Sequence, residues 1–597
     1  MGFLFHGYME NTEFYNLQIA KFTQESKQIF KQLSVLSVLR LTVFLSTVGI
    51  VYLLRQQWQW AFLSGLIGTV IFLALLSRYT DLKAKRALCK RLIKLNEEEI
   101  SINNGQYYHR EDGIQFQNSN HYYSLDIDLF GKGSFFQYMN RTNINEGMEK
   151  LSNILLANNI NGIENRQQAI KELAEIPNWT QLYAGLAQGI KTEYKASKII
   201  TWLKEYKPFL RPFHYWLSIS FSALSTGILA MVILQYMPIK VAGYWLLIGL
   251  GITGIYVKRI NILSQNTERT KNTFRQYALL LDQIENQSFT SELLKTQQQK
   301  LKLGDVKASK IFSEFTKALD ALDNRNNFIS AIFGNGYFLW DILQSYRVER
   351  WIIKYADKVE DWFSVVVFFD AFNSLGTYAY NHKDYVFPKI INDNTSIKAN
   401  ELGHPLLQVD KRIASNLELN KNEFFIVTGA NMAGKSTFLR TVGLHIVMAN
   451  IGLPVCAKSS HYTPIKLITS MRTTDSLKDD SSYFFSELTR LKFIVDTITT
   501  EDNYFVILDE ILKGTNSTDK AIGSKKFVER LVNIKATGII ATHDLSLTKI
   551  EDELEPVKNY FFDAQIINEE LYFDYKLKKG VCSNMNASFL LKKMEIV

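Results

Sequence analysis

The sequence predicts a multidomain protein with a doubly wound α/β domain at its C-terminal end, preceded by an all-α region that carries two hairpins of membrane-spanning helices. Three observations favour this fold class. A glycine-rich loop that ends in lysine and serine follows an apolar strand at Phe424–Val427. Two more apolar runs, Tyr504–Glu510 and Thr537–Asp544, end in polar residues, as buried strands of a parallel sheet do. Four nearly uncharged stretches occur as two closely spaced pairs in the N-terminal half.

The N-terminal stretch, residues 1–33, is polar and amphipathic, and we expect it to form a cytoplasmic segment. It has no short apolar core followed by small residues, so it lacks the pattern of a cleavable signal peptide. Two nearly uncharged runs follow, Leu41–Leu54 and Trp60–Ser77, each close to the ~20 residues needed to cross ~30 Å of hydrocarbon. Residues 34–77 are therefore predicted to form a first transmembrane hairpin.

A second pair of uncharged runs interrupts a longer helical region. Residues 78–212 are expected to be the first part of a helical core domain, and residues 258–400 its second part with a helical lever. Between them, Phe213–Gln235 and Val241–Val257 predict a second transmembrane hairpin over residues 213–257. Burial of both hairpins inside a soluble helical bundle is the alternative, because short apolar runs also fit buried helices.

Basic residues gather on the outer flanks of the four runs, whereas each connecting turn holds one, Arg55 or Lys240. Positive residues concentrate on the cytoplasmic side of a membrane. We therefore expect a multi-pass protein of the cytoplasmic membrane, with lipid as a partner and both termini and the α/β domain in the cytoplasm. The basic flanks are formed by Lys27, Lys31, Arg40, Arg78, Lys83, Lys85, Arg86, Lys90, Arg91, Lys204, Lys207, Arg211, Lys258 and Arg259.

The overall composition places few limits on the partners. The chain has 597 residues, and its net charge is only +9. Because much of the clustered positive charge flanks the apolar runs, anionic lipid explains it as well as nucleic acid does. The three cysteines, Cys89, Cys456 and Cys582, are too few and too scattered for a disulfide framework or a cysteine-based metal site. This usage is typical of a reducing compartment.

The most informative segment lies in residues 401–597, the predicted α/β domain. Here Gly429–Ser436 matches the phosphate-loop pattern Gly-x-x-x-x-Gly-Lys-[Ser/Thr]. Its two glycines allow a tight turn that points backbone N–H groups at phosphate oxygens, and Lys435 can reach the β and γ phosphates. Ser436 is then placed to bind Mg²⁺. The residues expected to contact ATP are Gly429, Ala430, Asn431, Met432, Ala433, Gly434, Lys435, Ser436 and Thr437.

Polar residues at the ends of the other two strands complete the predicted site. Asp509 is expected to hold Mg²⁺ through water, and Glu510 to orient the attacking water. His543 follows the last apolar run and is well placed to sense the γ-phosphate. Lys435, Glu510 and His543 are therefore the predicted catalytic residues. Ser436 and Asp509 are the predicted Mg²⁺ ligands, and ATP is the only small-molecule substrate expected.

Four motifs together resemble the ATPase domain of the MutS family: Thr428–Arg440, Asp509–Thr515, Ala541–His543 and Tyr575–Val581. The Asn-Met-Ala insert in the first motif separates this family from ordinary ABC ATPases, so the resemblance implies a P-loop ATPase of the ABC/MutS type. Ser482–Leu488 looks like the family's signature segment. By that resemblance, Ser482 completes the ATP site of the partner subunit, and the protein acts as a homodimer.

The resemblance also extends upstream, over roughly residues 120–180 and 360–597 in total. Asp126–Phe136 and Asn165–Leu173 look like the opening of the MutS core domain, and Asp370–Ala379 looks like its exit into the ATPase. Generic amphipathic core helices are the alternative for these helical stretches.

Two parts of mismatch-binding MutS proteins have no expected counterpart in this pattern. One is the N-terminal domain with its Phe-x-Glu reader, together with a connector domain, and the other is a C-terminal helix-turn-helix tail. The strings Phe312–Glu314 and Phe485–Glu487 lie in a helical pattern and in the signature segment, so we interpret both as coincidence. Mismatch recognition of the usual kind is not expected.

Two functions fit these observations. The first is a membrane-anchored MutS-family ATPase that binds DNA, in mismatch repair or recombination, with lever helices that grip DNA as ATP joins two subunits. The second is a MutS-like mechanochemical ATPase that drives or gates a membrane process without DNA. The family resemblance favours the first. The second transmembrane hairpin favours the membrane process, because this hairpin interrupts the lever about where the family places its DNA-gripping clamp.

Overall fold

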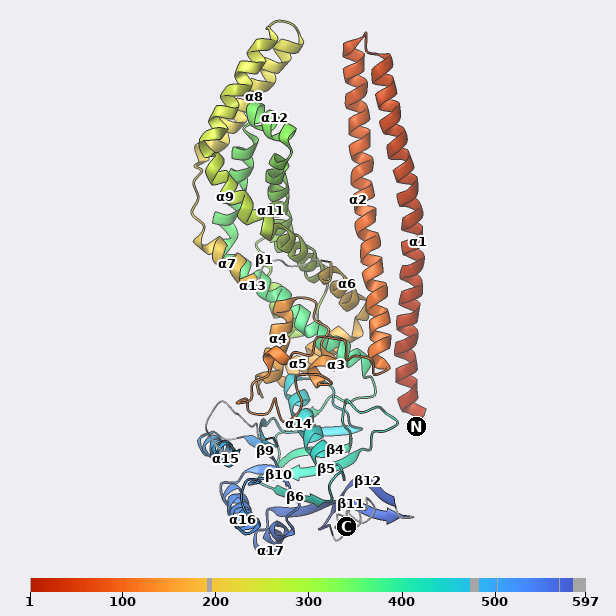
Figure 1. Ribbon diagram of the computed structural model, residues 1–597, viewed down its shortest axis with the longest axis vertical. Helices are drawn as coiled ribbons and strands as arrows, with labels where there is room; N and C mark the ends of the chain where they lie inside the picture. Colours follow the sequence, from red (N-terminus) through yellow and green to blue (C-terminus); the bar gives the residue numbers. More distant parts are fainter. Residues whose placement is uncertain (1, 190–195, 473–482, 502, 568–569, 583–597) are drawn as a thin grey trace.

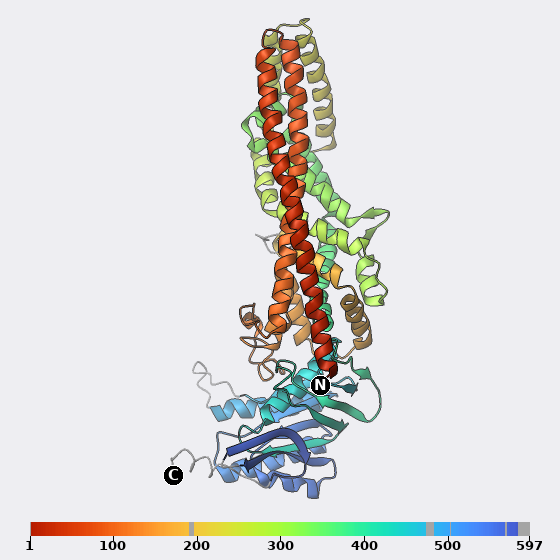
Figure 2. The same ribbon diagram turned by 90° about the vertical axis from the view of Figure 1, so that its right-hand side faces the viewer.

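The computed structural model describes residues 2–189, 196–472, 483–501, 503–567 and 570–582. The molecule is elongated, with long helices at one end and two β-sheets at the other (Figure 1). Two helical hairpins point away from the sheets, and the N-terminus lies beside the α/β part (Figures 1 and 2).

The first hairpin consists of two very long helices, α1 (Gly2–Leu53) and α2 (Trp58–Asn103). They run side by side in both views (Figures 1 and 2). Residues 2–33, the expected cytoplasmic segment, continue without a break into the apolar part of α1. This continuity is physically reasonable, because no glycine or proline interrupts the chain between Gly7 and Gly49. A small cluster of buried apolar side chains, Ile29, Leu33, Leu82 and Cys89, lies inside the hairpin.

Short helices connect the first hairpin to the rest of the helical region. Ser134 begins one of them by accepting a hydrogen bond from the backbone N–H of Gln137, and Pro177 begins another at a position that tolerates proline. Their apolar faces share one continuous core with the α/β part. These helices are η1 (Ile114–Phe116), α3 (Phe135–Met139), α4 (Asn145–Leu156), α5 (Ile163–Glu175), α6 (Pro177–Ala187) and α7 (Ala196–Glu205).

The second hairpin lies at the far end of the helical region (Figure 1). It is formed by α8 (Pro212–Ile233) and the first half of α9 (Ile239–Asn286). The second half of α9 descends toward the sheets and packs against α11 (Ala308–Asp323) and α13 (Trp340–Asn381). The remaining elements are α10 (Glu292–Gln299), β1 (Lys302–Leu303), β2 (Val306–Lys307), η2 (Asn324–Asn326) and α12 (Phe328–Phe338).

Within the described residues, four helices are long and apolar enough to cross a membrane. They coincide with the four uncharged runs noted in the sequence. The helical segments are Asn11–Leu53, Trp58–Asn103, Pro212–Ile233 and Ile239–Glu268.

A six-stranded mixed sheet forms the centre of the α/β part. Its order is β12-β11-β6-β10-β9-β8, with β12 antiparallel to β11 and the other five strands parallel. A second, four-stranded sheet has the order β3-β7-β4-β5. The strands of the first sheet are β6 (Phe424–Gly429), β8 (Lys466–Ser470), β9 (Tyr504–Asp509), β10 (Thr537–Ala541), β11 (Val557–Ile567) and β12 (Glu570–Lys579). Those of the second are β3 (Lys389–Ile390), β4 (Thr395–Leu402), β5 (Ser415–Asn420) and β7 (Ser459–Tyr462).

Helices cover both faces of the six-stranded sheet. Alternate residues of β6 point to opposite faces, and both sets are buried: Phe425 packs in the same core as α14 (Lys435–Ile451), and Phe424 in the other. The second core is closed by α15 (Tyr483–Thr500) and α16 (Ser517–Asn533). The predicted α/β architecture is therefore present, and η3 (Leu545–Lys549) and α17 (Ile550–Glu553) precede β11.

Candidate nucleotide-binding site

The strand register brings the predicted site residues to one edge of the sheet. Ala541 of β10 pairs with Val427 of β6 on one side and with Asp509 of β9 on the other. Because the three strands are parallel, their carboxyl ends meet at the same edge, which is where ligands bind in open α/β sheets. The glycine-rich loop, the two carboxylates and His543 follow directly from these three strand ends.

The loop after β6 has the backbone conformations that its glycines suggested. Gly429 and Gly434 have φ values of 150° and 101°, and a Cβ at Gly429 would lie 2.8 Å from the carbonyl oxygen of Phe562. Glycine is needed at such positions because side chains rarely tolerate them. Met432 also has a positive φ, of 66°, and its side chain is exposed. Asn431 is exposed as well, so two of the residues expected to contact ATP face solvent.

Lys435 begins α14 and turns back over the loop. Its ammonium group donates hydrogen bonds to the carbonyl oxygens of Gly429 (2.9 Å) and Ala430 (3.1 Å). The side chain is buried, and this burial lowers the pKa of Lys435, although the carboxylates of Glu510 and Asp509 oppose the shift. A partly desolvated cation at a helix N-terminus is well suited to bind a phosphate.

The two predicted Mg²⁺ ligands touch each other. The Ser436 hydroxyl donates a hydrogen bond to Oδ2 of Asp509 at 2.6 Å. Burial raises the pKa of Asp509, and the bond from Ser436 opposes that shift. A hydroxyl and a carboxylate oxygen fit Mg²⁺, which prefers oxygen ligands and takes only one or two carboxylates beside water and phosphate. Among the described residues, no group of three or more histidine, cysteine or acidic side chains is arranged to hold a metal ion, so a dedicated all-protein metal cage is absent from them.

Glu510 is paired with His543. Nε2 of His543 lies 2.8 Å from Oε1 of Glu510, and the hydrogen bond lowers the pKa of Glu510 to about 2. Lys513 and Lys435 contribute to the same shift. Nε2 of His543 also lies 3.1 Å from the ammonium nitrogen of Lys435. His543 therefore contacts both of the other predicted catalytic side chains, Glu510 and Lys435.

Glu487 has a role that the sequence did not reveal. Its buried carboxylate accepts hydrogen bonds from the backbone N–H groups of Leu512 (2.5 Å) and Lys513 (3.1 Å). Two residues of that loop, Glu510 and Leu512, have positive φ values of 49° and 58°, which are costly for residues with side chains. Glu487 therefore ties α15 to the strained loop that carries Glu510. The nearest sequence signal was an acidic residue inside the predicted signature segment.

The predicted trans-acting residue, Ser482, lies outside the described residues, which resume at residue 483. The motif Tyr575–Val581 lies in and just after β12, and the ring of Tyr575 approaches within 3.1 Å of where a Cβ on Gly434 would stand. Tyr575 of this motif therefore lies against the phosphate loop at Gly434.

The helical core contacts α14 directly. The carboxylate of Asp126 accepts hydrogen bonds from the Thr469 hydroxyl (2.5 Å) and the Met471 backbone N–H (3.1 Å), at the end of β8. Arg440, on α14, forms an ion pair with Asp128 at 3.1 Å. The segment that opens the predicted core domain thus touches the helix that begins at Lys435.

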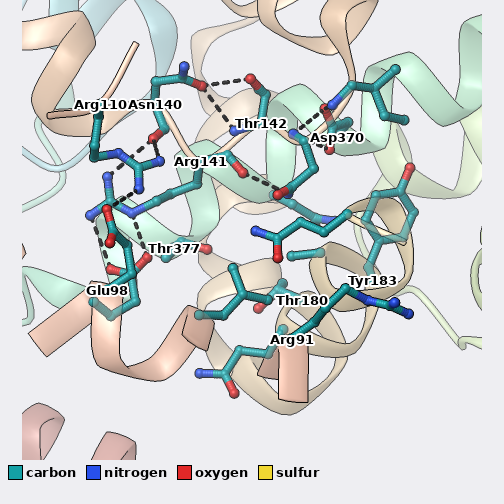
Figure 3. A pocket seen from close by; sticks show the side chains of 18 of the residues that line it. Arg91, Glu98, Arg110, Asn140, Arg141, Thr142, Thr180, Tyr183, Asp370 and Thr377 are labelled. Atoms are coloured by element: carbon teal, nitrogen blue, oxygen red, sulfur yellow. Dashed lines mark hydrogen bonds and ion pairs between the residues drawn. The ribbon is translucent and has the colours of Figure 1, made fainter. Parts of the chain in front are cut away.

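A separate cavity of about 940 Å³ lies between α2, α6 and α13. Figure 3 shows the polar groups that surround it, including the pairs Glu98–Arg110 and Asn140–Thr142. Asp370 accepts hydrogen bonds from the backbone N–H groups of residues 143 and 144, and burial raises its pKa to about 7. None of the residues predicted to contact ATP lines this cavity. It is the place where the first hairpin meets the core.

Comparisons with known proteins agree with the geometry of the α/β part. Residues 425–593 match the domain described as MutS domain V. MutS protein homolog 4 of Homo sapiens is 34% identical over 225 residues, which are 36% of this chain and 23% of that protein. The DNA mismatch repair protein MutS of Prochlorococcus marinus (strain NATL2A) is 34% identical over 223 residues, or 35% and 24% of the two chains. The same protein of Persephonella marina is 31% identical over 239 residues, or 39% and 27%.

The chain thus spans about a quarter of the length of these relatives. Its C-terminal third carries a MutS-type domain V, the ATPase domain of that family. The match begins at residue 425, within β6.

Proposed function

We propose that this chain is a membrane-embedded ATPase of the MutS family that binds and hydrolyses ATP with Mg²⁺ at the edge of the six-stranded sheet. The observation that carries this proposal is the convergence of Lys435, Glu510 and His543 from three parallel strand ends inside a MutS-type domain V. ATP hydrolysis is the reaction to which such a set of residues is suited.

Each residue has a distinct role in this proposal. Lys435 binds the β and γ phosphates, and the loop residues 429–437 hold the triphosphate through their backbone N–H groups. Ser436 and Asp509 would hold Mg²⁺, which neutralises charge on the phosphate oxygens when bound. Glu510 stays ionised near neutral pH because its pKa is about 2, so it accepts a hydrogen bond from the attacking water and orients it. His543 holds Glu510 in place.

The roles of Lys435 and Glu510 can be separated by two substitutions. Lys435→Ala should abolish ATP binding, whereas Glu510→Gln should leave ATP bound but lower its turnover by about a hundredfold or more, because it removes the carboxylate and keeps the shape. Nucleotide binding and phosphate release measured on the same samples test this division. Lys458→Ala, at a far more exposed surface lysine just before β7, is the matched control and should change neither. Equal loss of ATP affinity in both site variants would contradict the assignment.

The active unit in this proposal is a homodimer whose sites are completed by Ser482 of the opposite subunit. A Ser482→Arg chain mixed with a Lys435→Ala chain should recover one working site in each heterodimer, although each variant alone is inactive. Absence of recovery, in a mixture whose heterodimers are demonstrated separately, would refute the trans role of Ser482.

The proposed location is the cytoplasmic membrane, with the ATPase and both termini in the cytoplasm. Support comes from the four apolar helices and from the basic residues on their outer flanks. A cysteine at Gln57 or Met237, in the two turns, should react with an impermeant reagent from outside intact cells. A cysteine at the exposed Lys526 of the α/β part should not react. The three native cysteines are buried, which limits background labelling.

The geometry favours a membrane process as the work that ATP drives. The second hairpin and α12 form the far end of the helical lever, and their outward side chains are largely apolar. Such a surface suits lipid, whereas contacts to DNA phosphates require basic residues. Helix α13 runs from this end to the α/β part, so it can transmit a change between the two.

DNA binding is a second candidate function, favoured by the relatives described as DNA mismatch repair proteins. A mobility assay on detergent-solubilised protein, across salt concentrations and DNA structures, tests it. Retention of duplex, branched or mismatched DNA that weakens as salt rises would support it. No binding to any of them would leave the membrane process as the function.

A further inference from the structure

Helix α12 belongs to an uncharged segment that the four predicted spans do not include. No charged residue lies between Arg325 and Asp341, and Phe328–Trp340 is mostly aromatic, aliphatic or glycine. The helix has 11 residues, so at about 1.5 Å per residue it is far too short to cross a bilayer. Apolar runs of about 10 to 14 residues form either buried core helices or segments that enter a membrane and return.

Burial excludes the core-helix explanation. Phe328, Ile329 and Phe333 are 77%, 67% and 52% exposed, and Asn335 and Gly336 are the buried residues of the helix. The second hairpin, against which α12 packs, also exposes apolar side chains, and Ile255 of α9 is 76% exposed. Exposed apolar surface on adjoining helices is costly in water and marks contact with lipid or with another protein.

Contacts to the second hairpin set the depth of α12. Gly336 packs so closely against Gly249 that a Cβ on Gly249 would lie 2.2 Å from the Gly336 carbonyl oxygen. Gly249 is about ten residues below the first residue of α9, which corresponds to about 15 Å of helix. The hydroxyl of Ser222 donates a hydrogen bond to the carbonyl of Phe338 at 3.2 Å, at a similar distance below the top of α8. Both contacts place the end of α12 near half of the ~30 Å hydrocarbon thickness.

The backbone at this depth has the internal hydrogen bonds that lipid requires. Leu339 turns the chain with a φ of 48°, is fully buried, and donates its N–H to the carbonyl of Gly334. The Asn335 side chain accepts the N–H of Asp341 at 2.9 Å, and the carbonyl of Leu339 accepts the N–H of residue 343. Backbone that turns inside a membrane is tolerated only when neighbouring protein groups satisfy it in this way.

The two charges that flank the segment are paired with each other. Arg325 and Asp341 form an ion pair at 3.2 Å, and both side chains are nearly buried. Asp341 lies two residues beyond Leu339, at the depth of the turn, and the ion pair leaves neither charge isolated there.

We infer that α12 is a re-entrant membrane helix, which enters the bilayer from the cytoplasmic side, ends near its midplane against the second hairpin, and returns as α13. Its exposed phenylalanine and isoleucine side chains contact lipid acyl chains. This inference rests on the proposed membrane location of the second hairpin and adds a third membrane-embedded element to it. Because Leu339 joins α12 directly to α13, the lever that reaches the ATPase begins inside the lipid.

Site-directed spin labels on the full-length protein in phosphatidylcholine–phosphatidylglycerol vesicles test this placement. Single cysteines at Phe333 of α12, Leu224 of α8 and Asn326 before α12 are labelled, and each is exposed. Accessibility to oxygen, which enters lipid, and to a water-soluble nickel complex is then measured. Phe333 should behave like Leu224, with nickel accessibility at least about tenfold lower than at Asn326, because a polar complex is excluded from hydrocarbon.

Each of the remaining outcomes would refute a different part of this placement. Nickel access at Phe333 equal to that at Asn326, with Leu224 still in lipid, would refute the re-entrant helix alone. Nickel access at Leu224 as well would refute the membrane location of the hairpin. Low access of Phe333 to both reagents, with spin–spin broadening that disappears on dilution with unlabelled protein, would assign this face to a second copy of the chain instead of lipid.

Discussion

The two helical hairpins are both rich in apolar residues, but they differ in how much other helices pack against them. In the first, the most apolar windows of α1 and α2 are 0% and 6% buried, so they contact little except each other. In the second, the corresponding windows of α8 and α9 are 17% and 22% buried, because α12 and α13 pack against them. In the proposed membrane location, the first hairpin is therefore the anchor, whereas the second is part of the helical lever that leads to the α/β part.

The hairpins also meet the same helix at opposite ends. The second hairpin packs around the beginning of α13, where Ser222 contacts Phe338 just before it. The first hairpin reaches its end: the Tyr15 hydroxyl donates to the Asn381 side chain at 2.5 Å, and Asn381 donates to Glu99 of α2 at 2.8 Å. A movement of α13 can thus affect both hairpins, but only the second packs along it with both of its helices.

The largest expected difference comes from replacing one hairpin at a time. Replacing residues 213–257 with a short soluble linker should change ATP affinity or turnover about fivefold or more, because coupling between distinct sites is typically worth 1–3 kcal/mol. Replacing residues 41–77 should leave both nearly unchanged. ATP binding and hydrolysis, each measured with and without DNA, test this contrast. Equal effects of the two replacements on ATP binding and hydrolysis would contradict the proposed difference between the two hairpins.

Sequence patterns located the features that depend on neighbouring residues. The strand and loop from Phe424 to Ser436 are local, and so are the uncharged runs that form the four long apolar helices. The gathering of Asp509, Glu510 and Lys435 at one edge of the sheet followed from the rule that parallel strands share a carboxyl edge. These residues could be predicted because one strand, one turn or one helix determines each of them.

Other features depend on contacts between distant parts of the chain and could not be predicted. Helix α12 resembled any short apolar run, and only its exposure and its contact with Gly249 distinguish it from a core helix. The role of Glu487 depends on where a loop near Leu512 passes. Tyr15 and Asn381 are 366 positions apart, and nothing in either local sequence indicates the other. The roles assigned to the site residues themselves stay predictions.

The next largest effect concerns the ion pair at the base of the first hairpin. Glu99 of α2 holds the Arg141 guanidinium through two hydrogen bonds, at 2.5 and 3.0 Å, and both side chains are nearly buried. Glu99→Ala should cost about 3 kcal/mol of stability, because it leaves a buried arginine without its partner. Thermal unfolding in detergent measures the loss. Glu97→Ala, two residues away on the exposed face, is the control and should change stability little.

A smaller effect is expected where α12 meets the second hairpin. Gly249→Ala places a methyl group against the Gly336 backbone, which cannot yield easily, so we expect a loss of about 1–3 kcal/mol. Gly251→Ala, on the same helix, meets nothing within 4 Å and should be neutral or slightly stabilising. Unfolding midpoints of the two variants in the same detergent measure the difference. Identical midpoints would mean that α12 does not pack tightly on α9.

The smallest effect is expected at Tyr15, and it separates anchoring from coupling at the first hairpin. Tyr15→Phe removes only the hydroxyl that donates to Asn381, at a nearly fully buried position, so the loss should be about 1 kcal/mol. Tyr52→Phe, near the exposed top of α1, is the control and should cost nothing measurable. Asn381 also contacts Glu99 and the Asn11 side chain, so α13 keeps its other contacts with both helices in the Tyr15 variant.

If the first hairpin only anchors the protein, ATP turnover in Tyr15→Phe will equal that of the parent protein although stability falls. If turnover changes by more than the loss of stability explains, the end of α13 also couples the ATPase to the first hairpin. The two hairpins would then differ only in the strength of their coupling.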